Sequence, residues 1–231
     1  MDPNGILLVD KPAGMTSHDV VNAVRKMFNI QKAGHGGTLD PSATGLLILL
    51  IGGGTKFSGK VMCGDKVYEG VMKLGVETDT QDADGEIVAQ RGYEGITEEA
   101  LREAVASLKG DQYQVPPMVS ALKKDGIPLY KLARKGEVVE REPRFIHIHD
   151  FRITEFGLPE SRIFVKCSKG VYVRTLCHDV GAKLGCGGIL QSLRRTQSGK
   201  FSVENATPFA VLKETLRADF TKLLLPLSVV S

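Results

Sequence analysis

The chain has 231 residues, of which 42% are hydrophobic and 25% are charged, and its formal net charge is +3. This composition is ordinary for a globular protein and is sufficient for one sizeable core, with room for an appended lobe. No apolar run reaches membrane-spanning length, and the N-terminus lacks a basic region followed by a long apolar stretch. We therefore expect a cytoplasmic protein.

The charge is distributed unevenly along the chain. Residues 75–104 hold nine acidic and two basic side chains, whereas residues 160–200 hold eight Lys or Arg and only two acidic residues. A basic C-terminal third is suited to contact phosphates. A solvated surface explains the same charges equally well.

The four cysteines show no CxxC spacing. Cys177, His178 and Cys186 resemble part of a ligand set, but a fourth metal ligand at suitable spacing is missing. We expect buried, reduced thiols and no bound metal.

The first half of the chain predicts a buried strand at residues 5–11, a turn and then a helix with Ser17 as its N-cap. The apolar run 46–51 predicts a central strand, and residues 67–79 alternate as in a half-buried strand. The helix is expected to bury the apolar face formed by Val20, Val21, Val24 and Met27. The alternating strand is expected to place Tyr68, Met72, Leu74 and Val76 on one side.

The second half predicts a helix capped by Thr97, a short helix that starts after Pro128 and stops at Gly136, and strands at 143–154 and 162–174. A helix at 175–185 follows, with Gly185 as its stop. Strands outnumber helices at hairpin-like spacing, which favours an α+β fold with a mixed, mostly antiparallel central sheet flanked by helices and loops.

Four familiar motifs are absent from the sequence. "GGGTK" at 52–56 lacks the order of a phosphate-binding loop, and "DTQDADGE" places Thr80 and Arg91 where a calcium loop needs acidic ligands. Neither HExxH nor GxSxG occurs.

Asp40 is a carboxylate in a glycine-rich turn directly before the predicted central strand. Such a carboxylate can act as a nucleophile, a base or a metal ligand. The alternative is a helix N-cap, since Asp followed by Pro is a common start of a helix. His35 lies five residues earlier between two glycines, which leaves room for a ligand to approach closely.

Tyr172 and Arg174 form a second candidate cluster. They alternate with Val171 and Val173, so we expect both side chains on one face of a strand, where they suit a base and an anionic group. An edge strand with a salt-bridged arginine is an equally good interpretation.

Five ordered blocks of the sequence resemble the TruB family, the tRNA pseudouridine(55) synthases. The blocks are "GILLVDKPAGMTSHDVV", "KAGHGGTLDPSATGLL", "KVYEGVMKLGVETDTQDADGE", "QVPPMVSALKKDGIPLYKLARKG" and "SKGVYVRTLCHDVGAKLGCGGILQSLRRTQSG". The resemblance extends from Gly5 to about Leu227.

The resemblance implies the pseudouridine synthase fold and an enzyme that converts the T-loop uridine of tRNA without a cofactor or a metal. By the family motif, Asp40 is the catalytic residue and His35 helps to hold the T-loop. Tyr68 packs against the target base and Leu193 lines the uracil pocket. The remaining positions of the implied site are Tyr172, Arg174 and Lys11.

The implied reaction requires a flipped-out uridine and an ionised aspartate. An aromatic face such as Tyr68 can replace lost base stacking, which contributes ~1–3 kcal/mol per base. Burial raises the pKa of a carboxyl group and a nearby arginine lowers it, so we expect an Asp40–Arg174 ion pair. The basic third is then expected to hold tRNA phosphates.

Two departures from the family pattern stand out. Val119 replaces an aromatic residue, and the chain stops at "LLLPLSVVS", where bacterial members commonly begin an RNA-binding PUA domain. We expect a single catalytic domain over residues 1–231, active as a monomer without an obligate protein partner. A synthase with another RNA target, and a non-catalytic RNA-folding protein, remain alternatives.

Overall fold

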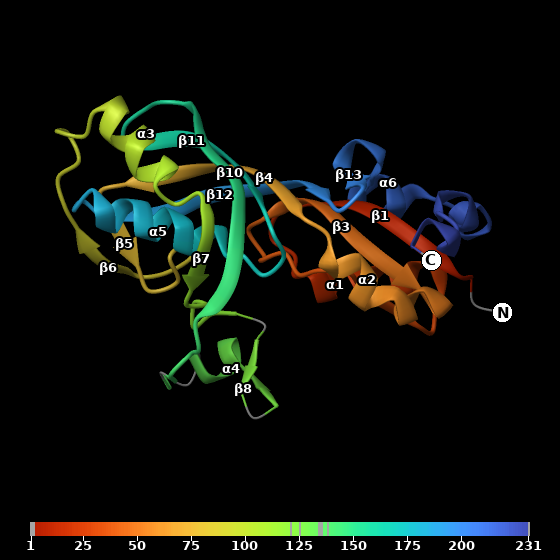
Figure 1. Ribbon diagram of the computed structural model, residues 1–231. Coiled ribbons are helices and arrows are strands. Elements are labelled where there is room, and N and C mark those ends of the chain that lie inside the picture. The colour runs from red at the N-terminus through yellow and green to blue at the C-terminus, as the bar shows by residue number, and fades with distance from the viewer. Residues whose placement is uncertain (1–2, 121, 125, 134–135, 138, 231) are drawn as a thin grey trace. The chain divides into compact units, whose positions relative to one another are not determined.

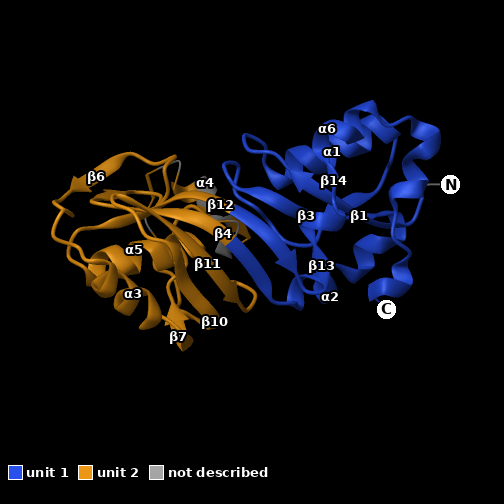
Figure 2. Cartoon of the chain, turned by 90° about the horizontal axis from the view of Figure 1, so that it is seen from above, with its two compact units in different colours: residues 1–68, 194–231 blue, residues 69–193 orange. Residues whose placement is uncertain are grey.

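The computed structural model describes residues 3–120, 122–124, 126–133, 136–137 and 139–230. The chain divides into two compact units, coloured separately in Figure 2. Unit 1 comprises residues 1–68 and 194–231, and unit 2 comprises residues 69–193. Two strands, β4 (Lys66–Leu74) and β12 (Gly188–Ser198), contribute residues to both units.

Unit 1 is built around strand β3 (Thr44–Ile51). This strand pairs antiparallel with β1 (Gly5–Lys11) and β2 (Ala33–His35), and parallel with β12 through Arg194 and Arg195. At the edges, β14 (Thr207–Pro208) runs parallel to β1, and β13 (Phe201–Ser202) forms a hairpin with β12. Figure 1 shows β1 and β3 side by side.

The predicted strand at 46–51 is confirmed as the centre of this unit, because all six of its residues are fully buried. An uninterrupted apolar run is typical of a strand covered on both faces. One side of β1 and β3 packs into a cluster that α2 and β13 help to close, formed by Ile6, Leu8, Leu46, Ile48, Leu50, Val61 and Phe201.

The first predicted helix is α1 (Ser17–Phe28), but its N-cap is Thr16 rather than Ser17. The Thr16 hydroxyl accepts from the Asp19 amide and the Asp19 carboxylate accepts from the Thr16 amide, a reciprocal capping box that outcompetes the neighbouring serine. Ser17 is thereby freed to bond elsewhere. The other helical segments of unit 1 are α2 (Ser58–Cys63), α6 (Phe209–Glu214), η1 (Gly52–Phe57), η2 (Val203–Asn205), η3 (Arg217–Leu223) and η4 (Leu227–Val230).

Unit 2 carries the strand order β12-β4-β11-β10-β7. The predicted strands at 143–154 and 162–174 correspond to β10 (Arg144–Glu155) and β11 (Glu160–Cys167), which pair antiparallel. β10 also pairs antiparallel with β7 (Gly110–Gln114). Together with unit 1, these pairings confirm a mixed, mostly antiparallel sheet.

The two longer helices of unit 2 match the sequence predictions. Thr97 caps α3 (Glu98–Ala106) as predicted, with its hydroxyl accepting from the Ala100 amide. Helix α5 (Val173–Lys183) starts two residues earlier than predicted, and Gly185 follows it at a φ of +74°. α3 packs on β10 and on α5. The hairpin β5 (Val76–Thr78) and β6 (Ile87–Gln90) completes this part.

The connection between β7 and β10 holds the short helix predicted after Pro128, observed as α4 (Leu129–Ala133) (Figure 1). It also holds the strands β8 (Lys123–Lys124) and β9 (Ile127–Pro128). Residues 134–135, just before the predicted stop at Gly136, lie outside the described residues.

The expectation of four buried thiols is partly wrong. Cys167, Cys177 and Cys186 are buried, whereas Cys63 at the end of the short helix α2 is exposed. Among the described residues, no helix combines the length and the apolar character that a membrane crossing needs.

Candidate functional site

Asp40 lies between β2 and β3 in an irregular segment of unit 1, and its side chain is half-buried. No helix starts at Pro41, because the chain bends and enters β3 at Thr44. The N-cap interpretation of Asp40 is therefore wrong. The carboxylate stands on a loop that leads directly into the most buried strand of the unit.

Lys11 at the end of β1 is fully buried and holds this loop. Its ammonium group donates to three main-chain carbonyls, those of Pro12 (2.8 Å), Met15 (2.6 Å) and Pro41 (3.1 Å). Burial lowers the pKa of Lys11 to about 8, with Arg195 acting in the same direction and Asp40 opposing it. Lys11 thus keeps its charge at neutral pH and places a cation within electrostatic reach of Asp40.

His35 is the last residue of β2 and is half-buried. Its Nδ1 atom is buried, and among the described residues no hydrogen-bond partner reaches it. Burial lowers the pKa of His35, with smaller contributions from the positive charges of Arg195 and His18. The imidazole is therefore mostly neutral at pH 7, a state in which it offers both a donor and an acceptor.

Tyr68 and Leu193 lie on strands that serve both units. Tyr68 is the third residue of β4 and belongs to unit 1, whereas Leu193 on β12 belongs to unit 2. Both side chains are half-buried. Their predicted roles against the target base remain predictions.

The expectation that Tyr172 and Arg174 share one face of a strand is wrong. Strand β11 ends at Cys167, Tyr172 is the N-cap of α5, and Arg174 lies in the first turn of that helix. A glycine at 170 with a φ of +85° turns the chain between strand and helix. Tyr172 has extended backbone angles and Arg174 lies inside the helix, so the two-residue alternation of a strand does not apply to this pair.

Gln114 on β7 fixes the position of Tyr172. Its side-chain carbonyl accepts from the Tyr172 amide (2.8 Å), and its side-chain amide donates to the Tyr172 carbonyl (3.2 Å). Gln114 is buried, so its side-chain carbonyl satisfies the Tyr172 amide, which has no acceptor inside the helix, while the Tyr172 carbonyl also accepts from the Leu176 amide (3.3 Å).

Arg174 is buried and joins three segments of unit 2. It donates to the carbonyls of Thr80 (3.0 Å) and Val119 (2.8 Å) and forms an ion pair with Asp82 (3.2 Å). The predicted ion pair between Arg174 and Asp40 joins residues of the two units and remains a prediction.

Four residues near the predicted positions escaped sequence reasoning: Ser17, Asp82, Gln114 and Arg195. Each is a buried polar side chain with at least one hydrogen-bond partner far away in the sequence. A usable signal existed for Arg195 only. Two adjacent arginines on a strand must point to opposite faces, so one of them must point inward if the strand lies inside a sheet.

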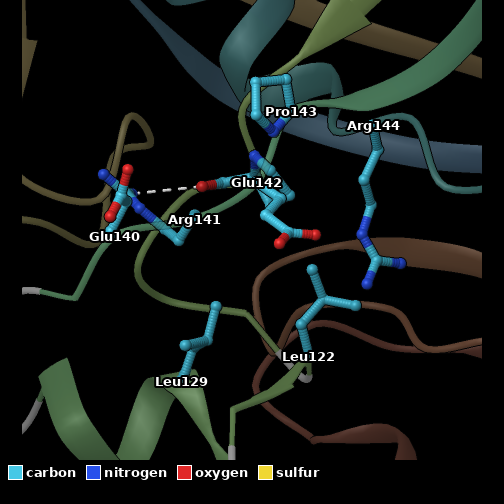
Figure 3. A pocket seen from close by; sticks show the side chains of 8 residues that line it. Leu122, Leu129, Glu140, Arg141, Glu142, Pro143 and Arg144 are labelled. Atoms are coloured by element: carbon cyan, nitrogen blue, oxygen red, sulfur yellow. Dashed lines mark hydrogen bonds between the residues drawn. The ribbon is translucent and has the colours of Figure 1, made fainter.

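A pocket of about 370 Å³ lies in unit 2 and contains none of the predicted site residues. Figure 3 shows its lining, which combines apolar and charged side chains: Pro116, Leu122, Leu129, Glu140, Arg141, Glu142, Pro143 and Arg144. Arg141 donates to the Pro116 carbonyl (3.1 Å) at one wall. Within the described part of the chain, no group of three His, Cys, Asp or Glu is arranged to hold a metal ion.

The mixed sheet, the helices beside it and the aspartate loop define an α+β protein of the pseudouridine synthase fold. The chain is similar to a chain of a solved Cbf5-Nop10-Gar1 complex, with a TM-score of 0.73 and 26% identity. The match covers 97% of this chain and 60% of that one. A Nop10-Cbf5 complex matches with a TM-score of 0.71 and 24% identity, again over about 60% of that chain's length.

The sequence comparisons are more specific. Residues 25–173 match the N-terminal domain of the TruB family of pseudouridylate synthases, and residues 174–229 match the tRNA pseudouridylate synthase B C-terminal domain. The chain therefore belongs to the TruB family, a family of pseudouridine-forming isomerases.

Two relatives illustrate the extent of the match. A tRNA pseudouridine synthase B of Opitutus terrae is 50% identical over 223 residues, which covers 96% of this chain and 92% of that protein. The protein of the same name from Pseudomonas aeruginosa is 50% identical over 210 residues, covering 91% of this chain and 69% of that protein.

Proposed function

We propose that this enzyme converts the T-loop uridine of tRNA, position 55, to pseudouridine, with Asp40 as the catalytic residue. The observation that carries the proposal is the 50% identity to a tRNA pseudouridine synthase B over nearly the whole length of both chains. The half-buried position of Asp40 supports its role, because the alternative of a structural helix cap no longer applies.

The reaction breaks the bond between C1′ of the ribose and N1 of uracil, turns the base, and joins C1′ to C5; C5 then loses its proton, and N1 ends with one. An ionised carboxylate is needed at the start, whether it attacks the sugar or the base or removes a proton. The buried ammonium of Lys11 favours the ionised form of Asp40 by charge attraction. We expect no cofactor, as the resemblance implies, and the net isomerisation consumes no oxidant, reductant or group donor.

We assign the other predicted residues to binding of the tRNA substrate. The target uridine leaves the loop and stacks on Tyr68, Leu193 lines the uracil pocket, and His35 contacts the T-loop. We assign Tyr172 and Arg174, which lie at the start of α5, to substrate binding as well. We further expect a monomer that acts in the cytoplasm on tRNA, with residues 1–231 as its catalytic domain.

The test is incubation with an unmodified tRNA transcript, followed by carbodiimide treatment and primer extension. The wild-type protein is expected to create a single new stop beside the T-loop uridine. Asp40→Asn is expected to abolish the stop and retain tRNA binding, whereas Asp84→Asn, at an exposed position, keeps wild-type activity. Active Asp40→Asn protein, or no pseudouridine with the wild type, refutes the proposal.

A further inference from the structure

The segment Gly37–Pro41 around Asp40 forms neither helix nor strand. Its main-chain groups therefore lack the regular partners that secondary structure supplies, and each needs a specific one wherever water is excluded. Following each carbonyl to its donor shows what holds Asp40 in place.

Arg195 provides the first two donors. This side chain on β12 is only 2% exposed, and its terminal nitrogens donate to the carbonyls of Gly37 and Thr38, both at 3.2 Å. Its Nε donates to the Leu46 carbonyl on β3 at 2.8 Å. One planar guanidinium thus ties the loop to the strand that follows it, and its fork geometry fixes both distance and direction.

Ser17 provides the third donor. Its hydroxyl donates to the Leu39 carbonyl (3.1 Å) and accepts from the Leu39 amide (2.8 Å). Both main-chain groups of the residue directly before Asp40 are therefore bound by one buried side chain. The displacement of the helix cap to Thr16 leaves the Ser17 hydroxyl available for this contact.

The remaining two carbonyls are bound as well. The Asp40 carbonyl accepts from the Ala43 amide (3.2 Å), and the Pro41 carbonyl accepts from the Gly14 amide (2.9 Å) and from Lys11. All five consecutive carbonyls of the loop have donors, and three of those carbonyls depend on Arg195 and Ser17.

The backbone of Arg195 is itself part of the sheet. It pairs with Gly45 in the parallel contact between β12 and β3, where Gly45 has a φ of +95°. A Cβ at this position would lie 2.3 Å from the Arg195 carbonyl oxygen. The glycine lets the two strands approach closely, and this close approach fixes the position of the Arg195 main chain from which the side chain extends.

We propose that Arg195 and Ser17 are positioning residues that set the direction of the Asp40 carboxylate. This inference rests on the proposed function, because it presumes that Asp40 reacts with the uridine. Reactive groups have to be held close to their productive geometry, and a displacement of ~1 Å can lower a rate roughly 100-fold. Arg195 and Ser17 act through the loop and contact neither sugar nor base in this scheme.

The first test is Ser17→Ala, which removes one hydroxyl and little volume. Its matched control is Ser198→Ala, because Ser198 is equally buried in the same unit and no hydrogen-bond partner reaches its hydroxyl among the described residues. We expect the single-turnover rate of Ser17→Ala to fall roughly tenfold, with an unchanged dissociation constant for tRNA. Ser198→Ala should keep the wild-type rate.

The second test compares Arg195→Lys with Arg195→Met. Lysine keeps the charge but cannot reach three carbonyls in a fork, so we expect a roughly 100-fold lower single-turnover rate with unchanged tRNA affinity. Arg195→Met should be slower still, so that lysine provides partial rescue. If the arginine variants do not fold, Ser17→Ala decides alone, because it leaves Arg195 intact.

The outcomes separate this inference from the proposed function. A wild-type rate in Ser17→Ala overturns the positioning role even when Asp40→Asn is inactive. A loss of rate matched by an equal loss of tRNA affinity overturns it too, since positioning affects the chemical step and spares binding. An inactive wild-type protein instead refutes the proposed function itself.

Discussion

Arg174 on α5 forms a buried ion pair with Asp82, a residue 92 positions earlier in the chain. The other oxygen of this carboxylate accepts from the Thr80 hydroxyl (2.5 Å) and from the Asp84 amide (3.1 Å). Because both oxygens and the guanidinium have partners, the pair meets the condition under which buried charges can be accommodated. It locks the turn after β5 to the start of α5.

Breaking this pair is expected to cost stability. Asp82→Ala leaves the Arg174 charge buried without its carboxylate, so we expect the free energy of unfolding to fall by ~3–5 kcal/mol. Urea unfolding measures the change. Asp84→Ala is the control, since its exposed side chain can be removed while its main-chain amide stays; a loss below about 1 kcal/mol in Asp82→Ala contradicts the prediction.

The pH dependence of the rate tests Lys11. Its pKa of about 8 predicts that the single-turnover rate declines above pH 8, because the neutral amine holds the loop at Pro41 less firmly. Arg in place of Lys11 stays charged and should move this decline beyond pH 9.5 or so. Rates measured from pH 6 upward that stay flat in the wild type argue against it.

The same pKa has a consequence for stability with a definite sign. The folded protein holds the Lys11 proton more weakly than the unfolded chain, whose lysine pKa is 10.5. Between pH 8 and 10.5 unfolding therefore takes up a proton, and this residue makes the free energy of unfolding rise with pH. Comparing wild type with Lys11→Met by urea unfolding at both ends of the window isolates this contribution.

Two glycine substitutions should have opposite effects. Gly45→Ala places a methyl group against the Arg195 backbone at a φ that disfavours side chains, so we expect a loss of several kcal/mol or failure to fold. Gly59→Ala lies in α2 with open space around its Cβ and should gain about 0.5–1 kcal/mol. Thermal unfolding of both variants measures whether stability falls in Gly45→Ala and rises in Gly59→Ala. Equal changes in stability would count against the packing argument.

Gln114→Leu tests whether the two hydrogen bonds from the Gln114 side chain to the Tyr172 main chain are needed for activity. The substitution leaves a main-chain N–H and a carbonyl of Tyr172 without Gln114, so we expect a loss of ~1–3 kcal/mol in stability and a slower isomerisation. Gln112→Leu on the same strand removes a side-chain bond to the Leu108 carbonyl and serves as the control for the rate. Equal rates in the two variants contradict the assigned role.

The regular elements of this protein were largely predictable. Hydrophobic pattern predicts three of them to within a few residues of their observed bounds: the apolar strand at 46–51, the capped helix after Thr97 and the alternating strand at 144–155. The segment 168–174 failed, because Tyr172 and Arg174 fit a strand and a helix start equally well over so short a stretch. Only the glycine turn after β11 decides between them.

The sequence by itself determined the family, the position of Asp40 and the strands that carry it, because these depend on local pattern and ordered motifs. Only the tertiary structure decided which buried groups bond one another: Arg174 with Asp82, Gln114 with Tyr172, and Arg195 with the loop before Asp40. The physical reason is that a buried polar group must find a partner wherever the folded chain supplies one, and that partner can lie far away in the sequence, as Thr38 lies 157 residues from Arg195.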